Sequence, residues 1–83
     1  MPEERIGVVD EYYARIGVVG IKLEARLAVR DVVHIKGHTT EFEQVVESMQ
    51  IEHENVSEAE AGMAVAVRVK ERCRDGDVVY RVT

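Results

Sequence analysis

The chain has 83 residues, of which 46% are hydrophobic and 33% charged, and its net charge is −5. This length accommodates one modest core, so we expect residues 1–83 to form a single domain. The longest uncharged apolar runs fall far short of the roughly 20 residues of a membrane helix, and the polar N-terminus predicts no secretory signal. A lone Cys73 excludes an internal disulfide, which fits a cytoplasmic protein.

Apolar residues recur with a period of two, which is typical of strands. Val65, Val67 and Val69 alternate with smaller or charged residues, and Val33 and Ile35 do the same earlier in the chain. Glycines separate these runs at intervals typical of turns. We therefore predict six strands, over residues 5–10, 15–23, 31–37, 41–53, 63–70 and 77–82. Six short strands around one core indicate an all-β fold, a closed or nearly closed six-stranded barrel.

Two connecting segments carry local predictions. Tyr12 and Tyr13 lie between the first two strands, and adjacent strand residues point to opposite faces. One ring should therefore enter the core and the other stay outside. The segment 55–61 is the one place where a helical turn is expected, because Ser57 and Glu60 have the spacing of a capping box.

The charges are unevenly distributed along the chain. Residues 37–67 contain no Lys or Arg but seven acids, whereas the segments on either side are rich in Lys and Arg. Two interpretations stay open. Either basic and acidic strands form solvated cross-strand ion pairs, or the electrostatic field of these charges orients a charged partner. The acidic Glu41–Glu60 segment is a candidate contact for a protein partner.

A basic stripe near the C-terminus is the main candidate binding site. It consists of Arg68, Lys70, Arg72 and Arg74, which share one parity and would project from one face of a strand that continued to Arg74. Their spacing of about 6.8 Å is similar to that of phosphates along an extended single strand. A solvated outer face, a nucleic-acid contact and an acidic protein partner all fit this stripe.

No catalytic constellation is evident in the sequence. The phosphate-binding loop motif is missing, and His34, His38 and His53 lack metal-ligand spacing. Cys73 lies between Arg72 and Arg74, whose charge would lower a thiol pKa, but no motif supplies it with a base. We expect no enzymatic activity, no cofactor and no metal.

The segment Ser48-Met49-Gln50-Ile51-Glu52-His53-Glu54-Asn55-Val56-Ser57-Glu58-Ala59, followed by Gly62, resembles a segment of another protein family. It is similar to the second domain, a small β-barrel, of the translation elongation factors that carry aminoacyl-tRNA. Residues 26–35 and Gly76-Asp77-Val78 resemble two further motifs of that domain, so the likeness covers about residues 15–83. Arg30 stands where the family has Gly, so this turn must avoid a positive φ or be reshaped.

The resemblance implies a fold and a candidate site. In the family this barrel holds the 3′ end of tRNA, with a Glu at the position of Gln50 and an Asn at that of Ala64. Neither group is kept here, whereas His53 matches a family His. The residues that the resemblance adds to the candidate site are Gln50 and His53.

These observations lead to one functional prediction and one alternative. The prediction is a non-enzymatic binding module that contacts RNA, tRNA or a ribosome-associated factor through the basic stripe, with Gln50 and His53. The alternative is an accessory module that docks to a larger enzyme or complex, since similar barrels occur as appended domains in some collagenase-like peptidases. Salt dependence distinguishes these two functions. Binding to phosphate weakens steeply as the salt concentration rises, whereas binding through an apolar protein interface changes little.

Overall fold

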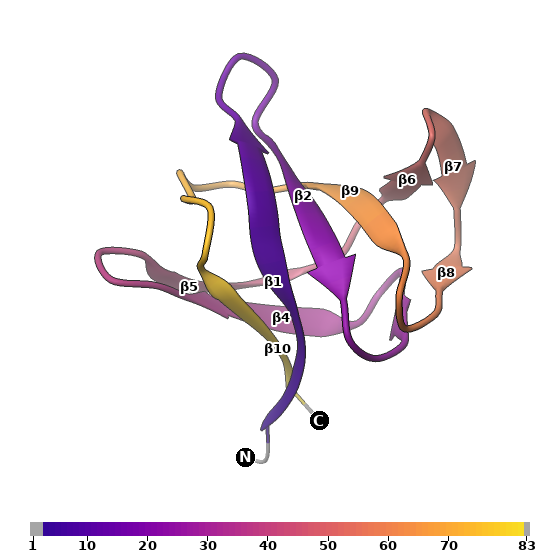
Figure 1. Cartoon of the computed structure of the whole chain (residues 1–83), viewed down its shortest axis with the longest axis horizontal. Coiled ribbons are helices and arrows are strands. Elements are labelled where there is room, and N and C mark those ends of the chain that lie inside the picture. Colours follow the sequence, from indigo (N-terminus) through magenta and orange to yellow (C-terminus); the bar gives the residue numbers. More distant parts are fainter. Residues whose placement is uncertain (1–2, 83) are drawn as a thin grey trace.

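The computed structural model describes residues 3–82 and contains ten strands within them. The strands are β1 (Glu3–Tyr13), β2 (Val18–Leu23), β3 (Leu27–Ala28), β4 (Val32–Lys36), β5 (Glu41–Val45), β6 (Met49–Ile51), β7 (Glu54–Val56), β8 (Glu58–Ala59), β9 (Ala64–Arg68) and β10 (Val78–Val82). Figure 1 shows their arrangement. Among the described residues no helix is long and apolar enough to cross a membrane.

Eight of the strands form one antiparallel sheet. Its order is β5-β4-β10-β1-β2-β9-β6-β7, and β3 pairs separately with β8. The long first strand is central: β1 pairs with β10 on one side and β2 on the other. The two ends of the sheet are β5 and β7, which the sequence separates by only a few residues.

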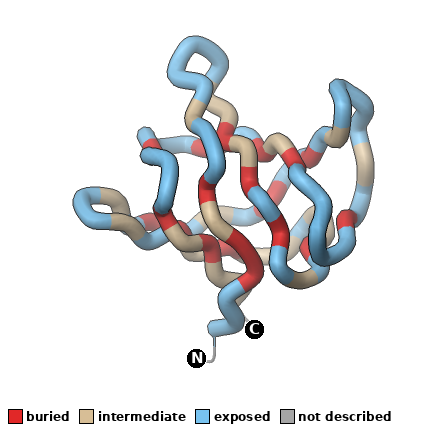
Figure 2. The backbone as a smooth tube through the Cα atoms, viewed as in Figure 1, coloured by how far each residue is buried: buried red, intermediate tan, exposed pale blue. Residues whose placement is uncertain are grey.

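The sheet surrounds one core built from the inward residues of its strands. Val65 and Val67 on β9 and Val33 and Ile35 on β4 are all nearly inaccessible, and they belong to one buried cluster. β4 and β9, which do not pair with each other, thus contribute to one core. Figure 2 shows that buried residues recur along the strands. The predicted period of two is confirmed, and so is the tyrosine pair: Tyr12 packs on the core, whereas Tyr13 is 43% exposed.

The all-β prediction is confirmed, but the predicted strands differ from those observed. Residues 41–53 do not form one strand, because the chain leaves β5 at Val46 to bond the turn that precedes β4. The Val46 amide donates to the Asp31 carbonyl (2.8 Å), and the Arg30 amide donates to the Val46 carbonyl (2.7 Å). Among the described strands no ladder joins β5 to β7, so the sheet is not a closed hydrogen-bonded ring.

The predicted helical turn over 55–61 is wrong. This segment contains β7 and β8 instead. Its backbone groups bond to a distant part of the chain: the Val29 amide donates to the Ser57 carbonyl (2.8 Å), and Leu27 pairs with Ala59. These long-range bonds replace the local bonds of a helix, so the Ser57 spacing has no capping role.

A tight turn before β4 contains a residue with positive φ. The Asp31 amide donates to the Ala28 carbonyl (3.1 Å), and Arg30 has φ of 84°. This is the third position of the turn, where a type II turn favours glycine. The turn therefore keeps its left-handed position with an arginine there. The Asp31 carboxylate accepts a bond from the Ala28 amide (3.0 Å) and holds the turn closed.

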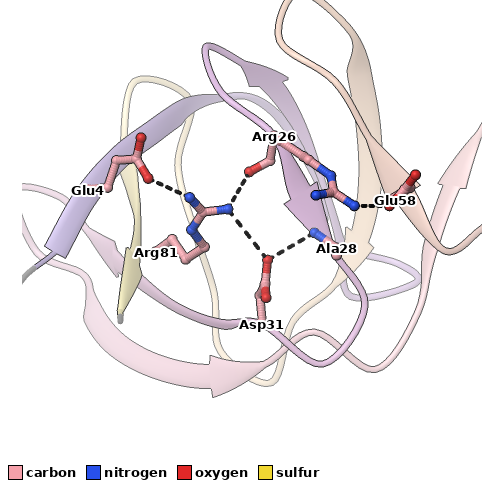
Figure 3. A network of polar contacts seen from close by, with 6 residues as sticks. All are labelled: Glu4, Arg26, Ala28, Asp31, Glu58 and Arg81. Carbon is pink, nitrogen blue, oxygen red and sulfur yellow. Dashed lines mark hydrogen bonds and ion pairs between the residues drawn. The ribbon is translucent and has the colours of Figure 1, made fainter.

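A network of charged side chains covers this end of the core, and we call it the paired end (Figure 3). Arg81 has the strand parity of the buried Val79, and its side chain is 25% exposed. It donates to the Arg26 carbonyl (2.9 Å) and to Glu4 Oε1 (2.5 Å), and it lies 3.8 Å from Asp31 Oδ2. The Arg26 side chain pairs in turn with Glu58.

Candidate functional site

A hollow lies where the end of β5 faces the C-terminal end of β9. Its volume is about 810 Å³. It is lined by residues of β5, β6, β9 and the following loop, among them Gln44, Val45, Gln50, Arg68 and Lys70. Arg68 and Lys70 are exposed, and Val45 is a large apolar side chain with 48% of its surface exposed. The hollow thus combines apolar surface with two cationic groups and the carboxylate of Glu47.

The Gln44 side chain bridges this hollow. Its Nε2 donates to the Arg68 carbonyl (2.7 Å), and the Lys70 amide donates to Gln44 Oε1 (2.9 Å). A side-chain amide has the same donor and acceptor as a peptide group, so Gln44 bonds to the β9 chain as a neighbouring strand would. These two bonds fix the backbone that carries Arg68 and Lys70.

A second hollow of about 490 Å³ adjoins the first. The two share Val18, Gln50 and Ala66 as lining residues. The second also contains Tyr13 and Ile16, which are 43% and 62% exposed. Large apolar side chains gathered at a hollow are typical of interaction sites. We call the two hollows together the groove face.

Gln50 and His53 lie on the β6–β7 hairpin at this face. Gln50 lines both hollows, and its Nε2 donates to Asn55 Oδ1 (3.1 Å) across the hairpin. His53 lines only the second hollow. The hairpin turn consists of Glu52 and His53, with φ of 51° and 68°. Positive φ at both positions gives the twist that two-residue hairpin turns need, although Asn-Gly is the preferred sequence there.

The basic stripe does not stay together. The prediction of four cations on one strand face is wrong, because β9 ends at Arg68 and the chain then turns. The chain bends at residues 70–71, before Arg72. A second turn follows Arg74, where the Asp77 carboxylate accepts a bond from the Arg74 amide (3.0 Å) and the Asp77 amide donates to the Arg74 carbonyl (3.2 Å). Arg72 and Arg74 line other, smaller hollows. Only Arg68 and Lys70 belong to the groove face.

The acidic Glu41–Glu60 segment is also divided by the fold. Glu41 and Glu43 lie on β5 at one end of the sheet, whereas Glu52 and Glu54 lie on the hairpin at the other end. Glu58 pairs with Arg26 at the paired end. The segment therefore contributes to three separate places.

Cys73 is part of the core. Its side chain is 2% exposed, and burial raises the pKa of its thiol to about 12, with Asp77 and Glu71 adding to the rise. The expected lowering by Arg72 and Arg74 is wrong, because desolvation of the thiolate outweighs these exposed neighbours. The thiol stays protonated and unreactive at neutral pH.

A further group of polar side chains surrounds His34 on the outer face of β4. Its Nδ1 lies 2.7 Å from Glu3 Oε2, and its Nε2 lies 3.2 Å from Glu41 Oε2. Glu43 stands directly opposite His34 in the β4–β5 register. Every buried side-chain nitrogen or oxygen within residues 3–82 has a hydrogen-bond partner.

Sequence reasoning missed the bridging role of Gln44 and the group around His34. Gln44 has the inward parity of Phe42, and a polar residue at an inward strand position was the available signal. Its partners on β9 are more than twenty residues away, so only the tertiary structure reveals the bridge.

Comparison with known proteins finds relatives that are named as a protease and as collagenases. No protein-family model matches the chain. An uncharacterized protease of Methanocaldococcus jannaschii is 41% identical over 76 residues, which are 90% of this chain and 19% of that protein. Two Porphyromonas gingivalis collagenases are each 33% identical over 78 residues, or 92% of this chain and 22% and 19% of theirs. The chain thus spans about a fifth of the length of the curated relatives it matches.

Solved structures show the same fold. The C-terminal domain of a Geobacillus thermoleovorans protein described as a U32 peptidase has a TM-score of 0.90 and 20% identity, over 96% of this chain and 93% of that chain. Its selenomethionine variant has a TM-score of 0.87 and 22% identity, over 92% and 96% of the two chains.

The elongation-factor interpretation is therefore wrong, both for the family and for an RNA-binding or tRNA-binding function. The relatives are named as a protease and collagenases, and the solved structures with this fold are C-terminal domains of a peptidase. The residues that suggested translation factors, such as Gly62, Gly76 and Asp31, lie in turns of the sheet. Turn residues report backbone geometry, which small β-domains of different function share.

Proposed function

We propose that this chain is a non-enzymatic accessory domain of the kind found in larger peptidase-like proteins, and that it docks onto another protein surface through the groove face. The carrying observation is the 41% identity over nearly the whole chain to one fifth of an archaeal protease. A segment that covers so small a share of its relatives fits an appended domain. The chemistry of peptide hydrolysis would then reside outside this segment.

The groove face has the composition of a docking surface. Tyr13, Ile16 and Val45 expose apolar surface there, and Arg68 and Lys70 add positive charge beside it. A fitting partner surface is apolar at its centre and carries charges of both signs around it, because Asp10, Glu11, Glu47 and Glu52 line the two hollows along with the two cations. A standard interface covers about 800 Å² on each partner, about a seventh of the 5390 Å² that this domain exposes.

We also infer that the sheet acts as a nearly closed barrel with Gln44 at the gap. The contacts in favour are its two bonds to the backbone of β9, which join the first strand of the sheet to the sixth. A rigid gap would hold both sides of the groove face at a constant separation.

The docking proposal is testable in trans. The M. jannaschii relative is prepared without its matching segment, and this chain is titrated into it by calorimetry at 50 and 200 mM salt. We expect saturable binding that changes little between the two salt concentrations, because apolar contact dominates. An Ile16→Glu variant should abolish binding, since it places a charge in the apolar contact.

Met63→Glu is the matched control. Met63 is 38% exposed and lies outside the residues that line the two hollows, so this variant should bind as the parent does. Absence of binding by a truncated relative that circular dichroism shows to be folded would overturn the docking proposal. Equal loss of binding in both variants would overturn the groove face as its site.

A further inference from the structure

The group around His34 brings together side chains from three strands of the sheet. His34 lies on β4, Glu41 and Glu43 lie on β5, and Glu3 reaches the same ring from β1, across β10. One ligand atom each from Glu3, His34 and Glu43 lies within 4.8 Å of the other two. The cluster is therefore compact, although its members are as much as 40 residues apart in the chain.

The imidazole is held in place and sheltered. The His34 side chain is only 12% exposed, and Tyr80 on β10 packs beside it with ring centroids 6.2 Å apart. Val33 and Ile35, on either side of His34 along β4, are anchored in the core. A ligand on a strand that is paired on both sides keeps its position, which lowers the cost of assembling a binding site.

The cluster carries more negative charge than its neighbours balance. Glu3, Glu41 and Glu43 surround a single imidazole, and within residues 3–82 none of the three is within ion-pair distance of a Lys or Arg. Lys36 is the cross-strand neighbour of Glu41, but the two form no ion pair. A bound cation would relieve the repulsion among these carboxylates.

We propose that Glu3, His34 and Glu43 form a binding site for a divalent transition-metal ion, of which Zn²⁺ is the best fit. One imidazole nitrogen and two carboxylate oxygens are ligands that Zn²⁺ accepts, with water in the fourth position. Mg²⁺ and Ca²⁺ prefer an all-oxygen set and fit less well. The proposed ion links β1, β4 and β5, so it reinforces the sheet on the face remote from the core.

Calorimetric titration of the chelator-treated protein with Zn²⁺ tests the site. We expect one ion per chain, no comparable heat with Mg²⁺, and a rise of about 10 °C in the unfolding midpoint at a free concentration a hundredfold above Kd. His34→Gln should abolish binding. Glu43→Gln should weaken it about tenfold or more, because one of three ligands is lost.

Two variants separate a metal site from an ordinary ion pair. Glu43 is exposed and makes no hydrogen bond to His34 within the described residues, so Glu43→Gln should not lower the unfolding midpoint of the metal-free protein, and the loss of one repelling charge should raise it slightly. His38→Gln removes an exposed histidine outside the cluster and should bind Zn²⁺ as the parent does. Absence of Zn²⁺ binding by the parent, or unchanged affinity in His34→Gln or Glu43→Gln, would overturn the proposal.

Discussion

The paired end and the groove face differ in the partners of their cationic side chains. At the paired end, Arg81 bonds to Glu4 and to the Arg26 carbonyl, and Arg26 pairs with Glu58. At the groove face, Arg68 and Lys70 have no carboxylate within ion-pair distance among residues 3–82. The first set of charges stabilises the domain itself, whereas the second remains available to a partner.

The two regions also differ in how far their apolar side chains are exposed. Leu27 and Ala59 are buried near the paired end, where β3 and β8 pair. Ile16 and Val45 are exposed at the groove face. Exposed cations are well solvated, but exposed apolar side chains gathered at a hollow are typical of interaction sites, so the comparison favours the groove face as the functional side. Four variants or pairs of variants test the difference.

We expect the largest loss of stability from a substitution that disturbs the close contact between β1 and β2. A Cβ at Gly7 would lie 2.6 Å from the Lys22 carbonyl and 2.9 Å from Ile21 Cγ2. Gly7→Ala must therefore push β1 away from β2, and we expect the free energy of unfolding to fall by about 2–3 kcal/mol. Urea denaturation monitored by circular dichroism measures the loss.

Gly20→Ala is the matched variant on the groove face. Its added Cβ would meet nothing closer than 3.8 Å, at the Glu11 carbonyl. We expect a change within about 0.5 kcal/mol. A loss as large as that of Gly7→Ala would show that the close contact of the added Cβ does not determine the loss.

The same substitution in the two regions should have unequal effects. Arg81→Met leaves Glu4 and the Arg26 carbonyl without their donor and removes the positive charge beside Asp31. We expect a loss of about 2 kcal/mol, less than for a fully buried pair because a quarter of the side chain is exposed. Arg68→Met should change stability by less than about 0.5 kcal/mol. Denaturation midpoints in urea measure both, and equal losses would remove the basis of the comparison.

The third test concerns the Gln44 bridge. Gln44→Leu removes two hydrogen bonds to the β9 backbone, and we expect a loss of about 1–2 kcal/mol. Amide hydrogen exchange at Lys70 should accelerate, since its donor loses its acceptor. Gln50→Leu removes only an exposed hydrogen bond to Asn55, so it should neither lower stability nor accelerate exchange at Lys70. Unchanged exchange at Lys70 in Gln44→Leu would show that the bridge does not hold the gap.

The smallest expected effect is a gain in stability. One residue in each region provides a site for it. Arg30 at the paired end and His53 at the groove face both have positive φ. Glycine adopts this conformation without the penalty of about 1 kcal/mol that other residues meet. Arg30→Gly and His53→Gly should each stabilise the domain by up to that amount, measured by thermal unfolding. A loss at either site would mean that the arginine or histidine side chain contributes more than its backbone strain costs.

Prediction from the sequence succeeded where the signal was local and periodic. Val65, Val67 and Val69 alternate with outward residues in the sequence and are buried as expected. It failed where distant contacts overrode a local pattern, as at Ser57, whose carbonyl bonds to Val29 instead of capping a helix. The basic stripe is divided for the same reason: β9 ends at Arg68, and the chain bends at residues 70–71 before it reaches Arg72 and Arg74.

By itself the sequence determined that this is a small all-β domain, because a two-residue apolar period around one core is a property of neighbouring residues. The tertiary structure alone decided which side chains meet. Gln44 reaches Arg68 across 24 residues, and His34 meets Glu3 across 31. Such contacts depend on strand order and register, which arise from the packing of the whole sheet and leave no periodic trace in the chain.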